Sequence, residues 1–329
     1  MEYISKIIFF AKEFIKVHII CTLISVFLFI TLILFAFFAN GPSDVKTEHN
    51  VNISSGLSLM QISLVLERNN IIRSKDMFRV VVILFGGENS IKAGPYLFDG
   101  TDNVFKVAIR ILKADYGVPV KKITIIEGMR SRDMLNLFGS EFSNLDKVEL
   151  EKELLSNEGY LFPDTYFFPL TSSSGDIIKM LSDNFSRHIL DLDLDKSKTS
   201  KDLKEIITMA SIIEGEAKED KDRKIVADIL WRRLEIGMLL QVDTTFMYIN
   251  GKPSSEITKA DLKIDSPYNT YVNKGLPPTP ISNPGMEAIN SVMFPTPNEY
   301  LYYLSDKDGL MHYSVTFEEH KKNKEKYLK

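Results

Sequence analysis

The chain has 329 residues, of which 44% are hydrophobic and 26% are charged, a composition that is ordinary for a folded protein and excludes a disordered or fibrous chain. Its 40 basic and 44 acidic residues leave a formal net charge of −4, so no overall positive field attracts DNA or RNA, and we exclude nucleic acid as a partner. The single cysteine, Cys21, excludes an internal disulfide and a cysteine-based zinc site.

An apolar run from Val17 to Ala39 carries one histidine and no formally charged residue. As a helix this run is about 34 Å long, enough to cross a hydrocarbon core that is roughly 30 Å thick. The alternatives are a buried core helix and a cleaved signal peptide, but the apolar region of a signal is typically ~7–15 residues long and ends at a cleavage site of small residues. We therefore predict a transmembrane helix over residues 17–39.

The charges on the two sides of this run differ. Lys6, Lys12 and Lys16 precede it, whereas residues 40–52 carry only Lys46 beside two acidic residues. The positive-inside rule then predicts a single-pass protein of the plasma (inner) membrane with a cytoplasmic tail, residues 1–16. Everything after residue 40 is expected on the outer, periplasmic or extracytoplasmic side.

Short elements follow a linker at residues 40–50, which contains a Gly-Pro-Ser turn signal. Apolar residues at helical spacing, an apolar run and a turn entering a strand indicate a small α+β module over residues 51–121. Its predicted elements are a helix at 58–70, an apolar run at 77–85, a turn and strand at 92–98, and an amphipathic helix at 103–113.

The remaining residues, 122–329, are expected to form a larger α+β domain. A strand at 121–127 is followed by a helix through Phe138, capped by Ser131 or Asp133. The aromatic-rich segment 158–169 leaves two alternatives open: a packed structural loop, or a surface where aromatic faces pack on sugar rings.

Two strong helices are predicted at residues 201–217 and 220–236, the second ending at Gly237. Glu214 and Glu216 stand at the end of the first. At ~100° per residue they point about 160° apart, so they cannot face each other across one substrate bond. Either glutamate borders apolar residues, where partial desolvation raises the pKa toward that of a general acid; either could instead be solvated or salt-bridged. Helix geometry does not choose between them.

Seven short blocks carry a more specific signal. They are IEGMR (126–130), EGYLFPDTY (158–166), ASIIEGE (210–216), RRLEIGMLLQVD (232–243), SPYNTY (266–271), GLPP (275–278) and NPG (283–285). In this order they resemble the YceG-like family of endolytic murein transglycosylases.

The resemblance implies an outward catalytic domain after a LysM-like subdomain, residues 51–121. It implies peptidoglycan glycan strands as the substrate, peptidoglycan synthases as candidate partners, and neither metal nor cofactor. In the family the second glutamate of the E-x-E pair is essential, which implies that Glu216 is catalytic. The sequence departs from the common pattern at Gly215, Ala217 and Thr244, and we expect Gly215 to loosen the helix just before the acid.

The mechanism that the resemblance implies needs one carboxyl group. Glu216 protonates the β-1,4 bond between N-acetylmuramic acid and N-acetylglucosamine, then deprotonates the muramyl 6-hydroxyl, leaving a 1,6-anhydromuramyl end. The alternatives are a noncatalytic membrane-anchored scaffold that binds peptidoglycan, and a muramidase that adds water.

Five polar or aromatic residues are candidates for contacts with the sugars. Amide and carboxylate groups bond hydroxyl and N-acetyl groups, and tyrosine rings stack on sugar rings. The alternative is turn capping for the first two and loop scaffolding for the other three. The candidates are Gln241, Asp243, Tyr268, Asn269 and Tyr271.

Overall fold

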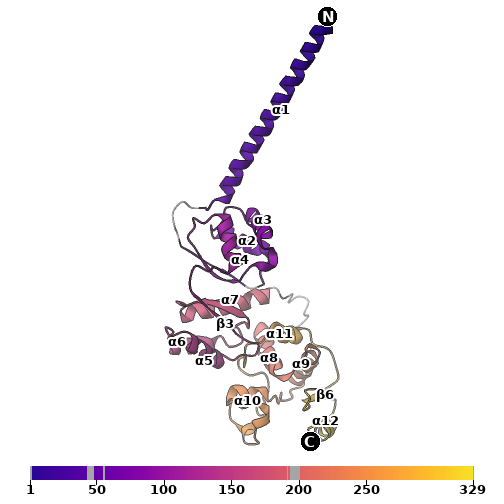
Figure 1. Cartoon of the computed structure of the whole chain (residues 1–329). Coiled ribbons are helices and arrows are strands. Elements are labelled where there is room, and N and C mark those ends of the chain that lie inside the picture. Colours follow the sequence, from indigo (N-terminus) through magenta and orange to yellow (C-terminus); the bar gives the residue numbers. More distant parts are fainter. Residues whose placement is uncertain (1, 43–47, 55, 191, 193–200, 329) are drawn as a thin grey trace. The chain divides into compact units, whose positions relative to one another are not determined.

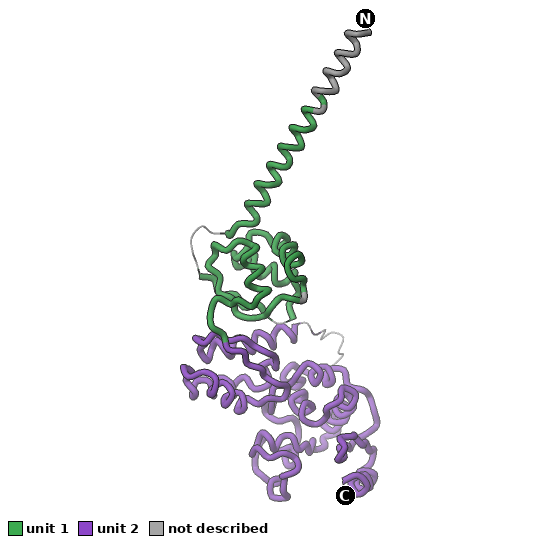
Figure 2. The backbone as a smooth tube through the Cα atoms, viewed as in Figure 1, with its two compact units in different colours: residues 1–120 green, residues 121–329 purple. Residues whose placement is uncertain are grey.

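The structure is a computed structural model of the whole chain, and it describes all residues except 1, 43–47, 55, 191, 193–200 and 329. The chain divides into two compact units, residues 1–120 and 121–329 (Figure 2). Both contain helices and small two-stranded sheets, which confirms the predicted α+β class. The finer division at residues 16, 39, 50 and 121 stays a prediction, as does the LysM-like character of residues 51–121.

Helix α1 (Glu2–Ala39) contains the predicted apolar run (Figure 1). Its segment His18–Ala39 has 22 residues and is long and apolar enough to cross a bilayer. Its apolar side chains are exposed, Phe27 by 69% and Leu32 by 64%, so this is no core helix. One N-terminal helix thus fits a single-pass membrane anchor.

The rest of the first unit is built on an antiparallel pair of strands, β1 and β2, in which His49 pairs with Phe98 and Ile53 with Gly94. The predicted helix at 58–70 begins at a capping box, because Ser58 and Gln61 bond each other's backbone amides. The elements are β1 (His49–Ile53), α2 (Leu59–Arg68), α3 (Lys75–Phe85), η1 (Glu88–Ser90), β2 (Gly94–Phe98) and α4 (Val104–Lys113).

The second unit has two hydrophobic cores. One lies under α5, α6, α7 and β4, and the other lies among α8, α9 and α11. Strand β3 lies beside β4, and β5 pairs antiparallel with β6. The elements are β3 (Val120–Thr124), α5 (Ser131–Glu141), α6 (Lys147–Ser156), β4 (Thr165–Pro169), α7 (Ser174–Leu190), α8 (Leu203–Glu216), α9 (Asp220–Glu235), α10 (Thr244–Ile249), η3 (Ser254–Glu256), η4 (Asp261–Lys263), α11 (Met286–Met293), β5 (Tyr302–Ser305), β6 (Met311–Ser314) and α12 (Phe317–Tyr327).

The structure corrects the predicted cap of α5 and decides between the two alternatives for the aromatic-rich segment 158–169. Helix α5 is capped by Arg130, without a side-chain bond, and the amide of Ser131 is bonded by Glu158 instead. The aromatic-rich segment is a packed structural element, because Phe162, Tyr166 and Phe168 are buried. The sugar-binding alternative for that segment is therefore wrong for these three rings.

Helices α8 and α9 agree closely with the two predicted helices. Asp202 starts α8 through a capping box with Glu205, and Gly237 follows α9 in the left-handed conformation. All eight residues from Ile206 to Ile213 are buried, so α8 is enclosed on every side and not amphipathic. Packing of α9 and α11 around it fixes the position of its last residue, Glu216 (Figure 1).

Candidate active site

A cavity of about 990 Å³ opens at the C-terminal end of α8. It is bordered by residues of the loop before α5, by the start of α10, by β5 and by α12. Both Glu214 and Glu216 line it. The two carboxylates differ in their partners.

Glu216 is held by two hydroxyl groups from distant parts of the chain. Its Oε1 accepts a hydrogen bond from the hydroxyl of Thr244, and its Oε2 accepts one from the hydroxyl of Tyr303 at 2.8 Å. Burial raises the pKa of Glu216, and the charge of Asp243 raises it further, while the two hydroxyl donors oppose the rise. A carboxyl with a raised pKa inside a cavity has the properties of a general acid.

Gly215 makes room for this arrangement. A Cβ added at Gly215 would lie 2.2 Å from Cγ2 of Thr244, closer than such atoms can approach. Helix α8 nevertheless continues through Gly215 to Glu216. The expectation that Gly215 loosens the helix is therefore wrong: the glycine permits the close approach of Thr244, whose hydroxyl reaches the carboxylate of Glu216.

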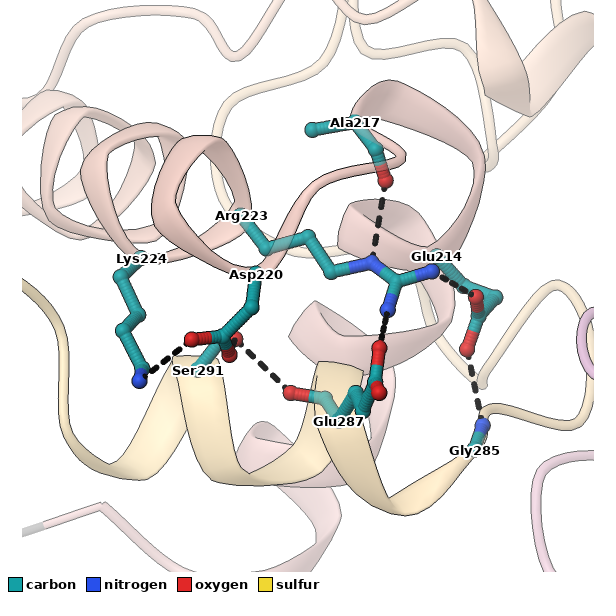
Figure 3. Close-up of polar contacts among 8 residues, drawn as sticks. All are labelled: Glu214, Ala217, Asp220, Arg223, Lys224, Gly285, Glu287 and Ser291. Carbon is teal, nitrogen blue, oxygen red and sulfur yellow. Dashed lines mark hydrogen bonds and ion pairs between the residues drawn. The ribbon is translucent and has the colours of Figure 1, made fainter.

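Glu214 is engaged in an ion pair. Its Oε1 lies 2.8 Å from a guanidinium nitrogen of Arg223, and its Oε2 accepts a hydrogen bond from the amide of Gly285 at 2.8 Å (Figure 3). The same guanidinium bonds Glu287 at 2.7 Å and the carbonyl of Ala217 at 3.0 Å. Burial raises the pKa of Glu214, and Gly285 and Arg223 oppose the rise. Glu214 thus links α8, α9 and the start of α11.

Three of the five predicted sugar-contacting residues line the cavity: Gln241, Asp243 and Tyr271. Asp243 is the N-cap residue of α10 but makes no side-chain cap; its carboxylate accepts hydrogen bonds from the hydroxyls of Tyr271 and Ser254. Gln241 is exposed, and its backbone has a φ of 49°, in the left-handed region. The capping alternative for Asp243 does not hold.

The other two residues support the loop. Asn269 is fully buried; its amide donates to the carbonyls of Leu262 and Ile264, and its oxygen accepts from the amide of Tyr271. The hydroxyl of Tyr268 bonds that of Thr279, and neither Tyr268 nor Asn269 borders the cavity. The structure therefore places Asn269 as the residue that holds Tyr271 in position.

The residues at the cavity that were not predicted as site residues include Thr244, Tyr303 and Arg233. Arg233 is 5% exposed, donates to the carbonyls of Leu240 and Leu301, and lies over the ring of Tyr303. Tyr303 is 87 positions from Glu216 in sequence, so no local pattern joins them. In the described part of the chain, no group of three His, Cys, Asp or Glu side chains is arranged to hold a metal ion.

Comparison with known proteins shows which proteins the chain is similar to. A model of the YceG-like family matches residues 51–326. The chain is 33% identical to an endolytic murein transglycosylase of Bacillus subtilis, over 87% of this chain and 86% of that protein. An endolytic murein transglycosylase of Streptococcus pneumoniae is 34% identical over 50% of this chain and 31% of that protein. A crystal structure of a YceG-like protein from Listeria monocytogenes, 31% identical, superposes with a TM-score of 0.55 over 84% of this chain and 99% of that chain.

Proposed function

Since the chain belongs to the YceG-like family, we propose that it is a murein transglycosylase that cuts the glycan strands of peptidoglycan, with Glu216 as acid and then as base. Relatives from Bacillus subtilis and Streptococcus pneumoniae carry the name of that activity, and the first is matched along most of its length. The observation that carries the assignment to Glu216 is its position: a carboxyl with a raised pKa, lining a large cavity, held by Thr244 and Tyr303.

The proposed reaction has two proton transfers. Protonated Glu216 donates to the oxygen of the β-1,4 bond between N-acetylmuramic acid and N-acetylglucosamine, and the bond from that oxygen to the anomeric carbon breaks. The resulting carboxylate accepts the proton of the muramyl 6-hydroxyl, whose oxygen bonds to the same carbon. A 1,6-anhydromuramyl end results, with no water consumed and no second nucleophile.

The hydroxyls of Thr244 and Tyr303 have a role in both steps. They stabilise the carboxylate form, so they limit how far burial raises the pKa of Glu216. A group that first gives and then takes a proton works best when neither form is strongly favoured. Burial of Tyr303 raises its own pKa well above 10, so its hydroxyl keeps its proton and remains a donor.

Gln241, Asp243 and Tyr271 are proposed to contact the sugars, because they line the same cavity as Glu216. Tyr268 and Asn269 are proposed to act indirectly by shaping the loop that carries Tyr271. We propose that α1 anchors the chain in the plasma membrane with residues 40–329 on the outer side, where peptidoglycan lies. Peptidoglycan synthases are candidate neighbours there.

The proposed function can be tested with the purified full-length chain and isolated peptidoglycan. Wild type is expected to release fragments with anhydromuramyl ends, detected by mass spectrometry, and Glu216→Gln is expected to bind the polymer without releasing them. Binding without cleavage by the wild type would instead indicate a noncatalytic scaffold. Reducing ends would indicate a muramidase.

A further inference from the structure

Helix α3, in residues 1–120, carries apolar side chains on more than its core-facing side. Phe78, Val81 and Val82 are buried. An apolar helix surface is normally covered, yet four further apolar residues of α3 are exposed. They are Val80, Ile83, Leu84 and Phe85, with 57%, 52%, 74% and 59% of their surface accessible.

The neighbouring helix α4 extends this exposed surface. The rings of Phe85 and Phe105 lie 6.4 Å apart. Phe105 is half-buried, and Ile109, one turn after it, is exposed. We call these side chains together the α3–α4 apolar surface. Contiguous exposed apolar residues on a folded unit mark a place where a partner or a membrane is contacted. The surface consists of Val80, Ile83, Leu84, Phe85, Phe105 and Ile109.

The short connection between α1 and β1 indicates that a bilayer is the partner nearest to this surface. Helix α1 ends at Ala39 and β1 begins at His49, so the connection can reach at most about 36 Å even when fully extended. Residues 49–120 are therefore tethered close to any bilayer that α1 crosses. The α3–α4 apolar surface is also continuous with that helix, because the ring of Phe105 lies 6.3 Å from the ring of Phe35, near the end of the apolar run.

We propose that the α3–α4 apolar surface inserts into the interface of the same bilayer that α1 spans, on the side where residues 40–329 lie. Apolar faces of peripheral helices bury roughly 5–10 Å into the boundary between headgroups and acyl chains. Contact with lipid explains why this apolar surface adjoins the apolar run of α1, which is itself long enough to lie in the bilayer. A second contact with the bilayer, beside α1, limits the rotation of residues 49–120 relative to the membrane. This proposal does not depend on the proposed enzymatic function.

The test uses the full-length chain with Cys21→Ser, because Cys21 is the only native cysteine. A single cysteine is introduced as Leu84→Cys, labelled with the fluorophore NBD, and the protein is reconstituted into phosphatidylcholine–phosphatidylglycerol vesicles. Ile83→Cys is a second position in the surface, and Arg68→Cys, exposed at the end of α2, is the matched control. All these positions are exposed, so the labels should not disturb the core.

The proposal predicts blue-shifted NBD emission at positions 83 and 84, and severalfold stronger quenching there than at position 68 when the lipids carry a nitroxide on the acyl chain. Water-like emission at all three positions would overturn it. A blue shift without quenching by the lipid nitroxide would also overturn it, because the surface would then be covered by protein.

Discussion

Cγ2 of Thr244 occupies the place that a side chain at Gly215 would need, since a Cβ there would come within 2.2 Å of it. Gly215→Ala is therefore expected to push Thr244 away and to remove its hydrogen bond to Glu216. Loss of a hydrogen bond to a charged group costs about 1.5–3 kcal/mol, so we expect the rate of strand cleavage to fall about tenfold or more.

The matched control for this prediction is Gly215→Ala combined with Thr244→Ser. Serine lacks Cγ2 but keeps the hydroxyl, and the other contacts of the added Cβ are at 3.4 Å or more. Activity should return toward that of Thr244→Ser alone in this double variant. If it stays as low as in Gly215→Ala, the clash is not the cause of the loss.

Tyr303→Phe is expected to shift the pH dependence of cleavage. The hydroxyl of Tyr303 lowers the pKa of Glu216, so its removal raises that pKa. Because Glu216 must be protonated to start the reaction, the alkaline limb of the kcat/KM profile should move to higher pH. A shift to lower pH, or a uniform loss with an unchanged profile, would contradict a direct bond to the acid.

Glu214→Gln and Glu216→Gln should separate stability from chemistry. Removing the charge of Glu214 leaves the buried guanidinium of Arg223 without its closest buried carboxylate, which typically costs a few kcal/mol of folding free energy. Removing the charge of Glu216 should leave stability unchanged or raise it, because its burial disfavours the ionised form. We therefore expect Glu214→Gln to lower Tm and keep measurable activity, and Glu216→Gln to keep Tm and lose activity. Equal loss of activity in two equally folded variants would speak against the assignment.

The raised pKa of Glu158 leads us to expect that the free energy of unfolding depends on pH. It is 3% exposed and bonds the amide of Ser131 and the side chain of Asn283, and burial raises its pKa from 4.5 to about 7. Because the folded pKa lies above the unfolded one, the stabilisation is fully present below pH 4.5 and is lost as the pH rises through about 7. The shift corresponds to about 3 kcal/mol.

The check is urea unfolding of wild type and Glu158→Gln between pH 4 and pH 8. The wild type should lose more stability than the variant over this range, because the amide that replaces the carboxyl does not titrate. Parallel curves for the two proteins would show that the carboxyl of Glu158 titrates normally in the folded state.

Sequence patterns predicted those parts of the fold that depend on interactions between residues close together in the chain. Apolar spacing located α2 and α8, and uninterrupted apolar length located the apolar segment of α1. The enclosure of α8 could not be predicted, since its cover comes from α11, some 70 residues later. The contacts of Glu216 are equally nonlocal, because the hydroxyl of Tyr303 reaches it from β5.

The two glutamates of α8 show the same limit. Helix geometry separated their directions but left open which one is the acid. The distinction lies in Arg223 and the amide of Gly285, which engage Glu214, and in Thr244 and Tyr303, which bond Glu216. Gly215 illustrates the reverse error: its intrinsic flexibility suggested a loosened helix, whereas its lack of a side chain is what matters.

Digestion of peptidoglycan in H₂¹⁸O by the full-length chain shows whether the carboxyl of Glu216 breaks the glycan strand without water. With the wild type we expect new muramyl ends that are 1,6-anhydro and carry no ¹⁸O, and with Glu216→Gln we expect no new ends. Incorporation of ¹⁸O at the new ends, or undiminished cleavage by Glu216→Gln, would contradict the proposed mechanism.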